Sequence, residues 1–237
     1  MKAVARRSLY RLPVLGTVVR KARISWIKRT QPFRDSGSYW EDRYKQGGLS
    51  GDGSYGRLAE FKANFLNRFV TEQNIKTVAE FGCGDGNQLK LATYPKYVGL
   101  DVSATAIKLC AESFAHDDSK TFVNLGAELA SDTTSAIRAE LVLSLDVIYH
   151  LVEDAVFHQY MESLFDTAER FVVIYSSNKE QPGQLPHVRH RKFTDWIRRH
   201  QSRWELVDEI PNIYPEDVRA EGATSHADFY VYGKATQ

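Results

Sequence analysis

The chain has little cysteine and no long run of apolar residues. Its 237 residues include two cysteines, Cys83 and Cys110, whose spacing makes neither a metal site nor a disulfide framework, which indicates a reducing cytoplasm. No stretch reaches the ~20 apolar residues that a membrane-spanning helix needs. The apolar run 12–19 is interrupted by Pro13 and Gly16 and precedes no small-residue cleavage site, so we expect no signal peptide. These absences favour a cytoplasmic globular protein.

Acidic residues are missing from the first segment of the chain. Residues 1–34 hold ten Lys or Arg and no Asp or Glu, which leaves 21 basic against 30 acidic residues, a balance of −9, in residues 35–237. The net charge of +1 hides this asymmetry. Because the main part of the chain is acidic and repels phosphate, we do not expect a nucleic-acid partner.

The basic residues of the first segment alternate with apolar ones. Apolar residues such as Ile24 and Trp26 recur at a roughly helical spacing, which Pro13 interrupts. A basic amphipathic segment with Trp suits an anionic membrane surface, and packing on the chain's own domain or on a second subunit explains the pattern equally well. We therefore predict a basic amphipathic helical arm over 1–34, with either peripheral attachment to the inner face of the membrane through 1–30 or oligomerisation through the arm.

Residues 77–86 combine a buried strand with a glycine-rich turn. Val78, Ala79 and Phe81 form the apolar run of a strand that is covered on both faces. A helix is expected to begin at Asn87, and a strand, a turn and a helix in this order place a ligand outside the carboxyl end of the strand. The backbone turns sharply and approaches a ligand closely at the three residues without a Cβ, which are Gly82, Gly84 and Gly86.

Glu80 and the third glycine indicate the kind of ligand. A dinucleotide fingerprint, G-x-G-x-x-G, would have its third glycine at position 87, where the chain has Asn87. A carboxylate at the strand tip repels phosphate and attracts an ammonium or sulfonium group. The alternative is a tight turn that binds no ligand.

The pattern acid-x-G-x-G-x-G resembles the first motif of the class I S-adenosylmethionine-dependent methyltransferases. Glu80, Gly82, Gly84 and Gly86 match that motif position by position. The resemblance covers about residues 39–235 and implies a Rossmann-like fold with S-adenosylmethionine as cofactor. It assigns the contacts of the first motif with the cofactor to Glu80, Gly82, Cys83, Gly84 and Gly86.

Further positions would hold the adenosine part of such a cofactor. Asp101 ends the second predicted strand, 19 residues after the first glycine, where an acid can accept hydrogen bonds from both ribose hydroxyls. Val102 would lie against the adenine. In the resembled family the loop after the third strand contacts the adenine, and the candidates here are Glu128 and the backbone of Ala127.

Residues 35–56 are predicted to cover the cofactor. Ser38 is the expected N-cap of a helix there, and five glycines within 46–56 predict a mobile lid. Arg43 or Arg57 would bind the carboxylate of the methionine moiety. For each of them, a surface salt bridge is an equally good explanation. Methyltransferases of the resembled class often have a Y/F-W-x-x-R-Y element before the core, matched here by Tyr39, Trp40, Arg43 and Tyr44.

The element Asp146-Val-Ile-Tyr-His-Leu151 follows the fourth predicted strand. It is similar to the D-V-x-x-H-L element that lies beside the transferable methyl group in class I methyltransferases, so the resemblance gives Asp146 both a cofactor-binding and a catalytic role. A hydroxyl acceptor benefits from a general base, and the pKa of histidine lies near the working pH. His150 is the first candidate base, and His187 and His190 are second. A capping or packing role is the alternative for His150.

Residues 178–191 form a polar insert that ends in two histidines and two arginines. Because Arg can bind a carboxylate or a phosphate with two hydrogen bonds, the insert predicts a substrate pocket for polar or anionic groups. A solvated charge run is the alternative. The predicted substrate-binding residues are His187, Arg189, His190 and Arg191.

The order of the elements predicts an α/β fold with a doubly wound, mostly parallel seven-stranded sheet, an antiparallel last strand and the basic helical arm. The predicted domains are the arm (1–34), the cofactor-covering segment with its lid (35–56) and the methyltransferase domain (57–237). No metal site is predicted, because no histidine cluster has ligand spacing. Strands are predicted over 77–81, 96–101, 121–125, 139–145, 171–177, 204–210 and 228–232, and helices over 57–74, 104–114, 154–170 and from 193.

The acceptor is predicted from two elements together. The Y-W-x-x-R-Y element with its lid, and Val188-Arg-His-Arg-x-Phe-Thr-Asp-Trp196, are similar to methyltransferases associated with bacterial surface-glycan synthesis. The sequence therefore predicts O-methylation of a sugar hydroxyl in a glycan or glycolipid. A small metabolite such as a quinone or lipid precursor is the alternative acceptor, and a catalytically silent cofactor-binding scaffold is the alternative to an enzyme.

Overall fold

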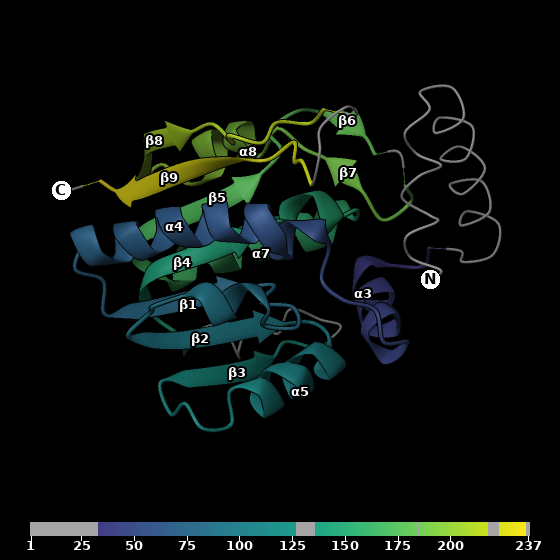
Figure 1. The fold of residues 1–237 in the computed structure, drawn as a ribbon. Coiled ribbons are helices and arrows are strands. Elements are labelled where there is room, and N and C mark those ends of the chain that lie inside the picture. The colour runs from purple at the N-terminus through teal and green to yellow at the C-terminus, as the bar shows by residue number, and fades with distance from the viewer. Residues whose placement is uncertain (1–32, 127–135, 184, 218–222, 236–237) are drawn as a thin grey trace.

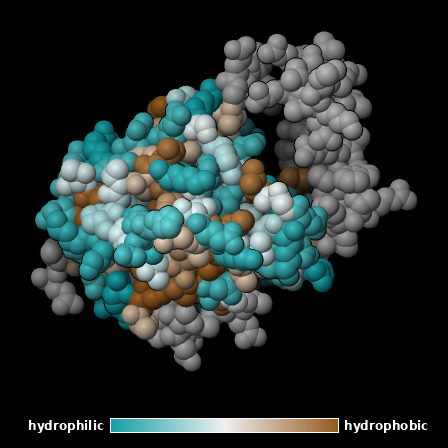
Figure 2. Space-filling view, turned by 60° about the horizontal axis from the view of Figure 1, so that its bottom comes forward, coloured by the Kyte–Doolittle hydropathy of each residue, from teal (hydrophilic) through white to brown (hydrophobic). Residues whose placement is uncertain are grey.

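The computed structural model of the chain describes residues 33–126, 136–183, 185–217 and 223–235 (Figure 1). The predicted arm lies outside these residues apart from its last two positions, and so do Ala127 and Glu128. Within the described part, no helix is both long and apolar enough to cross a membrane. Figure 2 shows one face of the molecule, where hydrophilic residues predominate and hydrophobic ones gather in smaller patches.

The main sheet has seven strands in the order β3-β2-β1-β4-β5-β9-β8. The strands are β1 (Thr77–Phe81), β2 (Lys96–Asp101), β3 (Lys120–Asn124), β4 (Ala139–Leu145), β5 (Ala168–Ser176), β8 (Trp204–Ile210) and β9 (Asp228–Lys234). The described α-helices are α3 (Ser36–Lys45), α4 (Gly56–Glu72), α5 (Ala104–Ser113), α7 (Asp154–Thr167) and α8 (Phe193–His200). Single 3-10 turns are η1 (Asp52–Ser54), η2 (Gln88–Leu91) and η3 (Ile148–His150).

The strand order confirms the predicted doubly wound topology. Strands β1 to β5 pair in parallel, and β9 pairs antiparallel with both β5 and β8. From β1 the chain runs outward through β2 to β3 and then returns to β4 on the other side of β1. In such sheets a ligand binds where the order reverses, at the carboxyl ends of the strands. The fold therefore places the candidate site at the tips of β1 and β4.

Two hydrophobic cores cover the two faces of the sheet. Successive residues of β4 alternate between them: Leu141 and Leu143 pack with α4 and α5, whereas Val142 packs with α7 and α8. Because the side chains of a strand point alternately to its two faces, a strand buried on both faces reads as a continuous apolar run. Figure 1 shows α4 lying across one side of the sheet, close to β4 and β5.

Three local expectations were wrong. The short helix expected from Asn87 is only the single 3-10 turn η2, which ends at Leu91. The helix expected to reach position 170 ends at Thr167, since Ala168 already pairs with Ala139 of β4. The N-cap of α3 is Asp35, whose carboxylate accepts a hydrogen bond from the Ser38 amide at 2.7 Å.

The insert contains structure that the sequence did not predict. Residues Gln181–Pro182 (β6) pair antiparallel with Arg189–His190 (β7) in a separate two-stranded sheet. This hairpin turns residues 185–188 back toward the carboxyl ends of the main strands, where they line a cavity.

Candidate active site

A cavity of about 590 Å³ opens at the carboxyl ends of β1, β2 and β4. Its walls come from the glycine turn, from α3 and the lid, from η3, and from residues 185–188 and 224–226. This volume lies within the range of small-molecule sites, roughly 300–1,000 Å³. The predicted residues that line it are Glu80, Gly82, Cys83, Gly84, Asp101, Val102, Asp146, His150 and His187.

The glycine turn adopts a backbone that other residues tolerate poorly. Gly82 and Gly84 have φ angles of 81° and 59°, in the left-handed region where a Cβ is strained. A Cβ on Gly82 would collide with Val147, and one on Gly84 would collide with the Ser50 hydroxyl. The amides of Gly82 and Cys83 both donate to the Leu100 carbonyl, at 2.7 and 3.1 Å. The turn is therefore held tightly between β2 and the lid.

Two buried carboxylates flank the glycine turn. Glu80 is 4% exposed and accepts a hydrogen bond from the Tyr97 hydroxyl at 2.7 Å. Asp101 is 7% exposed and accepts from the amides of Gly84 and Ser103, both at 2.9 Å. Burial raises the pKa of Glu80 to about 7 and that of Asp101 to about 6. A ligand that brings positive charge or hydroxyl donors would stabilise the ionised form of both carboxylates.

The thiol of Cys83 lies within the same wall. Cys83 and Cys110 are free and buried. A hydrogen bond with Cys110, together with burial, raises the pKa of the Cys83 thiol well above its ordinary value, so the group is uncharged. Gly86 does not line the cavity; its amide donates to the Cys83 carbonyl at 3.3 Å.

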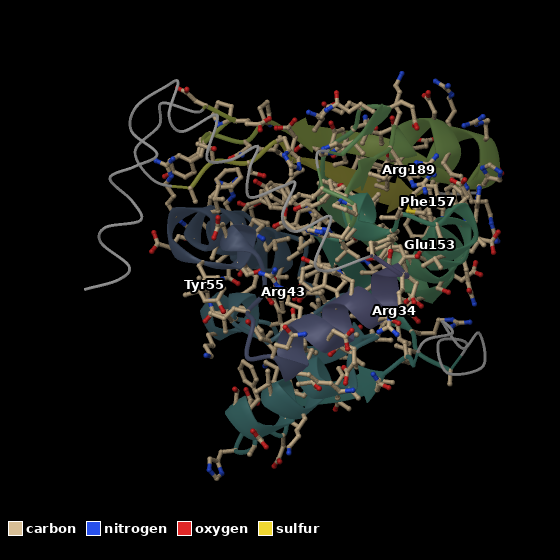
Figure 3. The ribbon with its side chains drawn as sticks, turned by 90° about the vertical axis from the view of Figure 1, so that its right-hand side faces the viewer. Arg34, Arg43, Tyr55, Glu153, Phe157 and Arg189 are labelled. Carbon is tan, nitrogen blue, oxygen red and sulfur yellow. The ribbon has the colours of Figure 1, made fainter. Side chains whose placement is uncertain are left out.

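Helix α3 spans the mouth of the cavity and is attached at both ends. Near its start, the Ser36 hydroxyl donates to Glu153 at 2.6 Å and the Ser36 amide donates to the same carboxylate at 2.9 Å. Near its end, the Glu41 carboxylate accepts from the Ser103 hydroxyl at 2.6 Å and from the Thr105 amide at 3.2 Å. In Figure 3 α3 runs from the side of Glu153 toward Tyr55. The helix thus connects the β2 end of the cavity to the η3 end.

The lid is bound to the glycine turn through Asp85, which the sequence did not single out. The Asp85 carboxylate accepts from the Ser50 amide at 2.9 Å and from the Tyr55 hydroxyl at 2.8 Å. Asn87 donates to the Ser54 carbonyl at 2.7 Å. The lid therefore lies closed against the turn.

Asp146 forms a charged cluster that the sequence did not predict. Its carboxylate accepts from the Lys62 ammonium at 2.6 Å and from the Tyr149 hydroxyl at 2.8 Å. Asp146 has a φ angle of 61°, which is uncommon for a residue other than glycine. Proximity to Asp146 and burial keep Tyr149 protonated, because both raise the pKa of its phenol. Lys62 and Tyr149 line the cavity as well.

His150 lies at the η3 end in a defined protonation state. Its Nδ1 is 3.0 Å from the His187 carbonyl oxygen, which can only accept a hydrogen bond, so Nδ1 carries the proton. Burial lowers the pKa of His150 to about 4, so the ring is neutral at pH 7 and Nε2 has a free lone pair. The edge of the Trp40 ring system packs against the His150 ring at 4.9 Å between centroids. The ring therefore has the protonation state of a general base, and its pKa of about 4 makes it a weaker base than an ordinary histidine.

The other two predicted histidines lie in different places. His187 lines the cavity and stacks on Tyr39 with ring centroids 4.1 Å apart. His190 is 6% exposed, does not line the cavity and has its Nδ1 2.7 Å from the Ser177 hydroxyl. Its neighbour His226, which the sequence did not indicate, does line the cavity, and among the described residues its Nε2 is buried without a hydrogen-bond partner.

The predicted arginines lie outside the cavity lining. Arg191, whose side chain is 7% exposed, donates to Asp154 at 2.6 Å and to the carbonyls of Leu151 and Val152. Arg189 pairs with the same Asp154 at 3.0 Å. Figure 3 shows Arg189 beside Phe157 and Glu153, at one side of α3. These two arginines link the insert to the start of α7 rather than facing a ligand.

Arg43 also differs from the expected placement. Its Nε donates to the Leu49 carbonyl at 2.7 Å, and its guanidinium lies 5.4 Å from the Trp40 ring centroid. It lines a separate surface hollow with Arg34 and Asp42. The structure thus uses Arg43 to connect α3 to the lid.

The cavity lining is acidic. Among its described residues, Lys62 is the single Lys or Arg. Burial lowers the pKa of His150 and His187 to about 4 and also lowers that of His226, so the three imidazoles are neutral at pH 7. No group of three potential ligands arranged to hold a metal ion occurs in the described part of the chain. The acidic side chains of the lining are Asp35, Asp52, Glu80, Asp101, Asp146 and Glu153.

Comparison with known proteins identifies the fold. No protein-family model and no curated protein sequence matches the chain. A magnesium protoporphyrin IX methyltransferase (ChlM) from Synechocystis PCC 6803 with bound SAH is similar in structure, with 16% identity, coverage of 84% of this chain and 97% of that one, and a TM-score of 0.59.

Two further methyltransferase structures agree with this match. The N-methyltransferase NodS from Bradyrhizobium japonicum WM9, in complex with S-adenosyl-l-homocysteine, has 13% identity, covers 85% of this chain and 99% of its own, and gives a TM-score of 0.62. The methyltransferase domain of bacterial CtHen1-C has 18% identity, 74% and 97% coverage and a TM-score of 0.56. This chain therefore has the class I methyltransferase fold.

Proposed function

We propose that the chain is an S-adenosylmethionine-dependent methyltransferase that O-methylates a sugar hydroxyl of a glycan or glycolipid, with His150 as the general base. The observation that carries the proposal is the single cavity that joins the glycine turn to His150. One end has the carboxylates and tight turn of a nucleoside site, and the other end has a neutral imidazole with a free Nε2.

The residues at the β1 and β2 tips fit S-adenosylmethionine. Gly82 and Gly84 line the cavity at the tip of β1, between the two buried carboxylates. Asp101 would accept the ribose hydroxyls, and Glu80 would attract the positive charge of the methionine moiety. When bound, this cofactor supplies an electrophilic methyl group on a positively charged sulfur.

The residues at the η3 end fit activation of a hydroxyl. Nε2 of His150 would accept the proton of the acceptor hydroxyl, and the proton on Nδ1 would stay hydrogen-bonded to the His187 carbonyl. The positive charge then ends on the His150 ring, where burial disfavours it and the nearby Asp146 carboxylate offsets part of that cost. Helix α3 covers this end, where the Ser36 hydroxyl donates to Glu153.

The lining favours an uncharged acceptor. Six carboxylates against one ammonium repel anions, and the arginines expected to bind anionic groups are engaged elsewhere. Trp40 and Tyr149 offer aromatic surface, and Thr224 and Ser225 offer hydroxyl partners. A neutral sugar, with an apolar ring face and several hydroxyls, suits such a mixed surface.

A His150→Gln variant tests the proposal. We expect methyl transfer from radiolabelled cofactor to a panel of neutral glycans and glycolipids to fall about 10²- to 10⁴-fold, the range for loss of a general base. Cofactor affinity by calorimetry should stay within about threefold, since His150 lies at the other end of the cavity. His190→Gln is the control and should retain activity, because His190 lies outside the lining.

Four results would contradict the proposal in different ways. Failure of the wild-type protein to bind the cofactor would remove the methyltransferase assignment. Cofactor binding without transfer to any acceptor would support a silent scaffold, and transfer to quinone or lipid precursors alone would support a small-metabolite enzyme. Unchanged turnover in His150→Gln would remove His150 from the reaction.

A further inference from the structure

Lys62 occupies a position where an apolar residue would be expected. It lies on the face of α4 that packs on the sheet, in line with Leu58, Ala59, Leu66 and Val70. Its side chain is 1% exposed, and lysine is almost never buried unless it is paired. The helix therefore brings one positive charge through its apolar face to the cavity.

Asp146, the partner of Lys62, is contacted from several sides. Lys62 Nζ lies 2.6 Å from Asp146 Oδ2, and Tyr149 donates to Oδ1 at 2.8 Å, so each carboxylate oxygen has a donor. A Cβ on Gly53 of the lid would meet Oδ2 as well, which shows how closely the lid encloses the group. The Lys62 ammonium also lies 5.3 Å from the Tyr175 ring centroid. Asp146 thus has one defined orientation.

Asp146 stands next to the glycine turn. It directly follows β4, the strand that pairs with β1 up to Ser144, and the next residue, Val147, occupies the space where a Cβ of Gly82 would be. A ligand that extends from Asp101 along the strand tips to His150 has to pass the Asp146 carboxylate, because β1 and β4 are neighbours at the point where the strand order reverses.

We propose that Lys62 is a positioning residue that holds Asp146 and Tyr149 at this point. Its positive charge also offsets the negative charge that Asp146 presents to a sulfonium cofactor. This inference rests on the proposed function. An unpaired carboxylate beside the cofactor would stabilise the charged sulfonium but not the neutral thioether product. Stabilising a reactant more than the transition state slows the reaction, so the Lys62 charge removes an attraction that would oppose methyl transfer.

The charge balance can be measured without an acceptor. Sinefungin has a protonated amine where the cofactor has its sulfonium, and S-adenosylhomocysteine has a neutral thioether. The ratio of their dissociation constants, sinefungin over S-adenosylhomocysteine, reports the preference of the site for positive charge. A purely structural role of Lys62 would weaken both ligands together and leave this ratio unchanged.

The experiment measures the ratio by calorimetry at pH 6.5 for the wild type and four variants. Lys62→Gln keeps a hydrogen-bond donor but loses the charge, so the ratio should fall about tenfold, the order expected for one unit charge roughly 12 Å away at an effective dielectric constant of about 20. Lys62→Arg keeps the charge and should stay within about twofold of the wild type. Tyr149→Phe changes no charge and should also leave the ratio within about twofold.

If Lys62→Gln fails to fold, Asp146→Asn provides the test instead. It leaves the Lys62 charge unbalanced, so the ratio should rise. The proposal is overturned by an unchanged ratio in Lys62→Gln, or by an unchanged ratio in Asp146→Asn when only that variant folds. Absence of binding of both ligands to the wild type would instead refute the cofactor assignment, and with it any role of Lys62 toward that cofactor.

Discussion

The two ends of the cavity are built from different kinds of structure. The end at β1 and β2 consists of backbone amides, a left-handed glycine turn and two buried carboxylates, all within residues 77–103. The end at η3 consists of aromatic and imidazole side chains from α3, η3, residues 185–188 and residues 224–226. The first end depends on one β-turn-β unit, and the second depends on the packing of four distant segments.

This difference separates binding of a common cofactor, at the first end, from recognition of a particular acceptor, at the second. A backbone site holds a common ligand whatever the surrounding side chains are. A site made of side chains on loops changes its ligand when the loops change. We therefore expect substitutions at the first end to remove cofactor binding altogether, and substitutions at the second end to separate residues that contact the acceptor from residues that support the fold.

Gly82→Ala should have the largest effect and tests the first end. At φ 81° an alanine is strained and its Cβ collides with Val147, so we expect affinity for S-adenosylhomocysteine to fall more than about 100-fold by calorimetry. Gly37→Ala is the matched control, because Gly37 also lines the cavity but lies in α3, where a Cβ makes ordinary contact. Equal affinity losses in the two variants would show that the left-handed backbone at Gly82 is not what cofactor binding requires.

Arg191→Met should have the next largest effect and tests the second end. It removes hydrogen bonds to Leu151, Val152 and Asp154 from a buried position, so we expect the free energy of unfolding to fall by about 2–4 kcal/mol in urea titrations. Arg189→Met, at 36% exposure and paired with the same Asp154, should cost under about 1 kcal/mol. A stable Arg191→Met protein with a raised acceptor KM would restore the predicted substrate role.

Glu80→Gln should have the smallest effect and a defined pH dependence. The folded-state pKa of Glu80, about 7, lies above its ordinary value of 4.5, so ionising it costs stability as pH rises from about 4.5 through 7. The variant lacks this cost and should be more stable by about 1–3 kcal/mol at pH 8, with the difference vanishing near pH 4.5. Thermal unfolding at pH 5 and pH 8 measures it; a constant difference at both values would contradict the assignment.

Much of the fold could be predicted because its signals are local. The continuous apolar runs of β1, β4 and β5 predict strands buried on both faces, and the turn between β1 and η2 reads directly from its glycines. The errors occurred where tertiary contacts override local preference, as where Ala168 leaves the helix to pair with Ala139. The β6–β7 hairpin had no sequence signal because each strand has only two residues.

The second end of the cavity was predicted less well. Arg189, His190 and Arg191 lie beside the site but contact α7 and Ser177 instead of the cavity. His226 was missed because it is 76 positions from His150 and reaches the same cavity lining only in the folded chain. Lys62 had a usable signal, since a lysine within the apolar stripe of the helix predicted over 57–74 implies a buried partner.

The sequence by itself determined the doubly wound sheet, the glycine turn and the two acids beside it, because these follow from apolar periodicity and from backbone geometry that only glycine adopts easily. The tertiary structure alone decided which partners the charged and imidazole side chains have around the cavity. It directed Arg191 to Asp154, brought Lys62 to Asp146 and left Nε2 of His150 free. A side chain's role depends on the nearest partner in space, and Lys62 and Asp146 become neighbours only when α4 packs on the sheet.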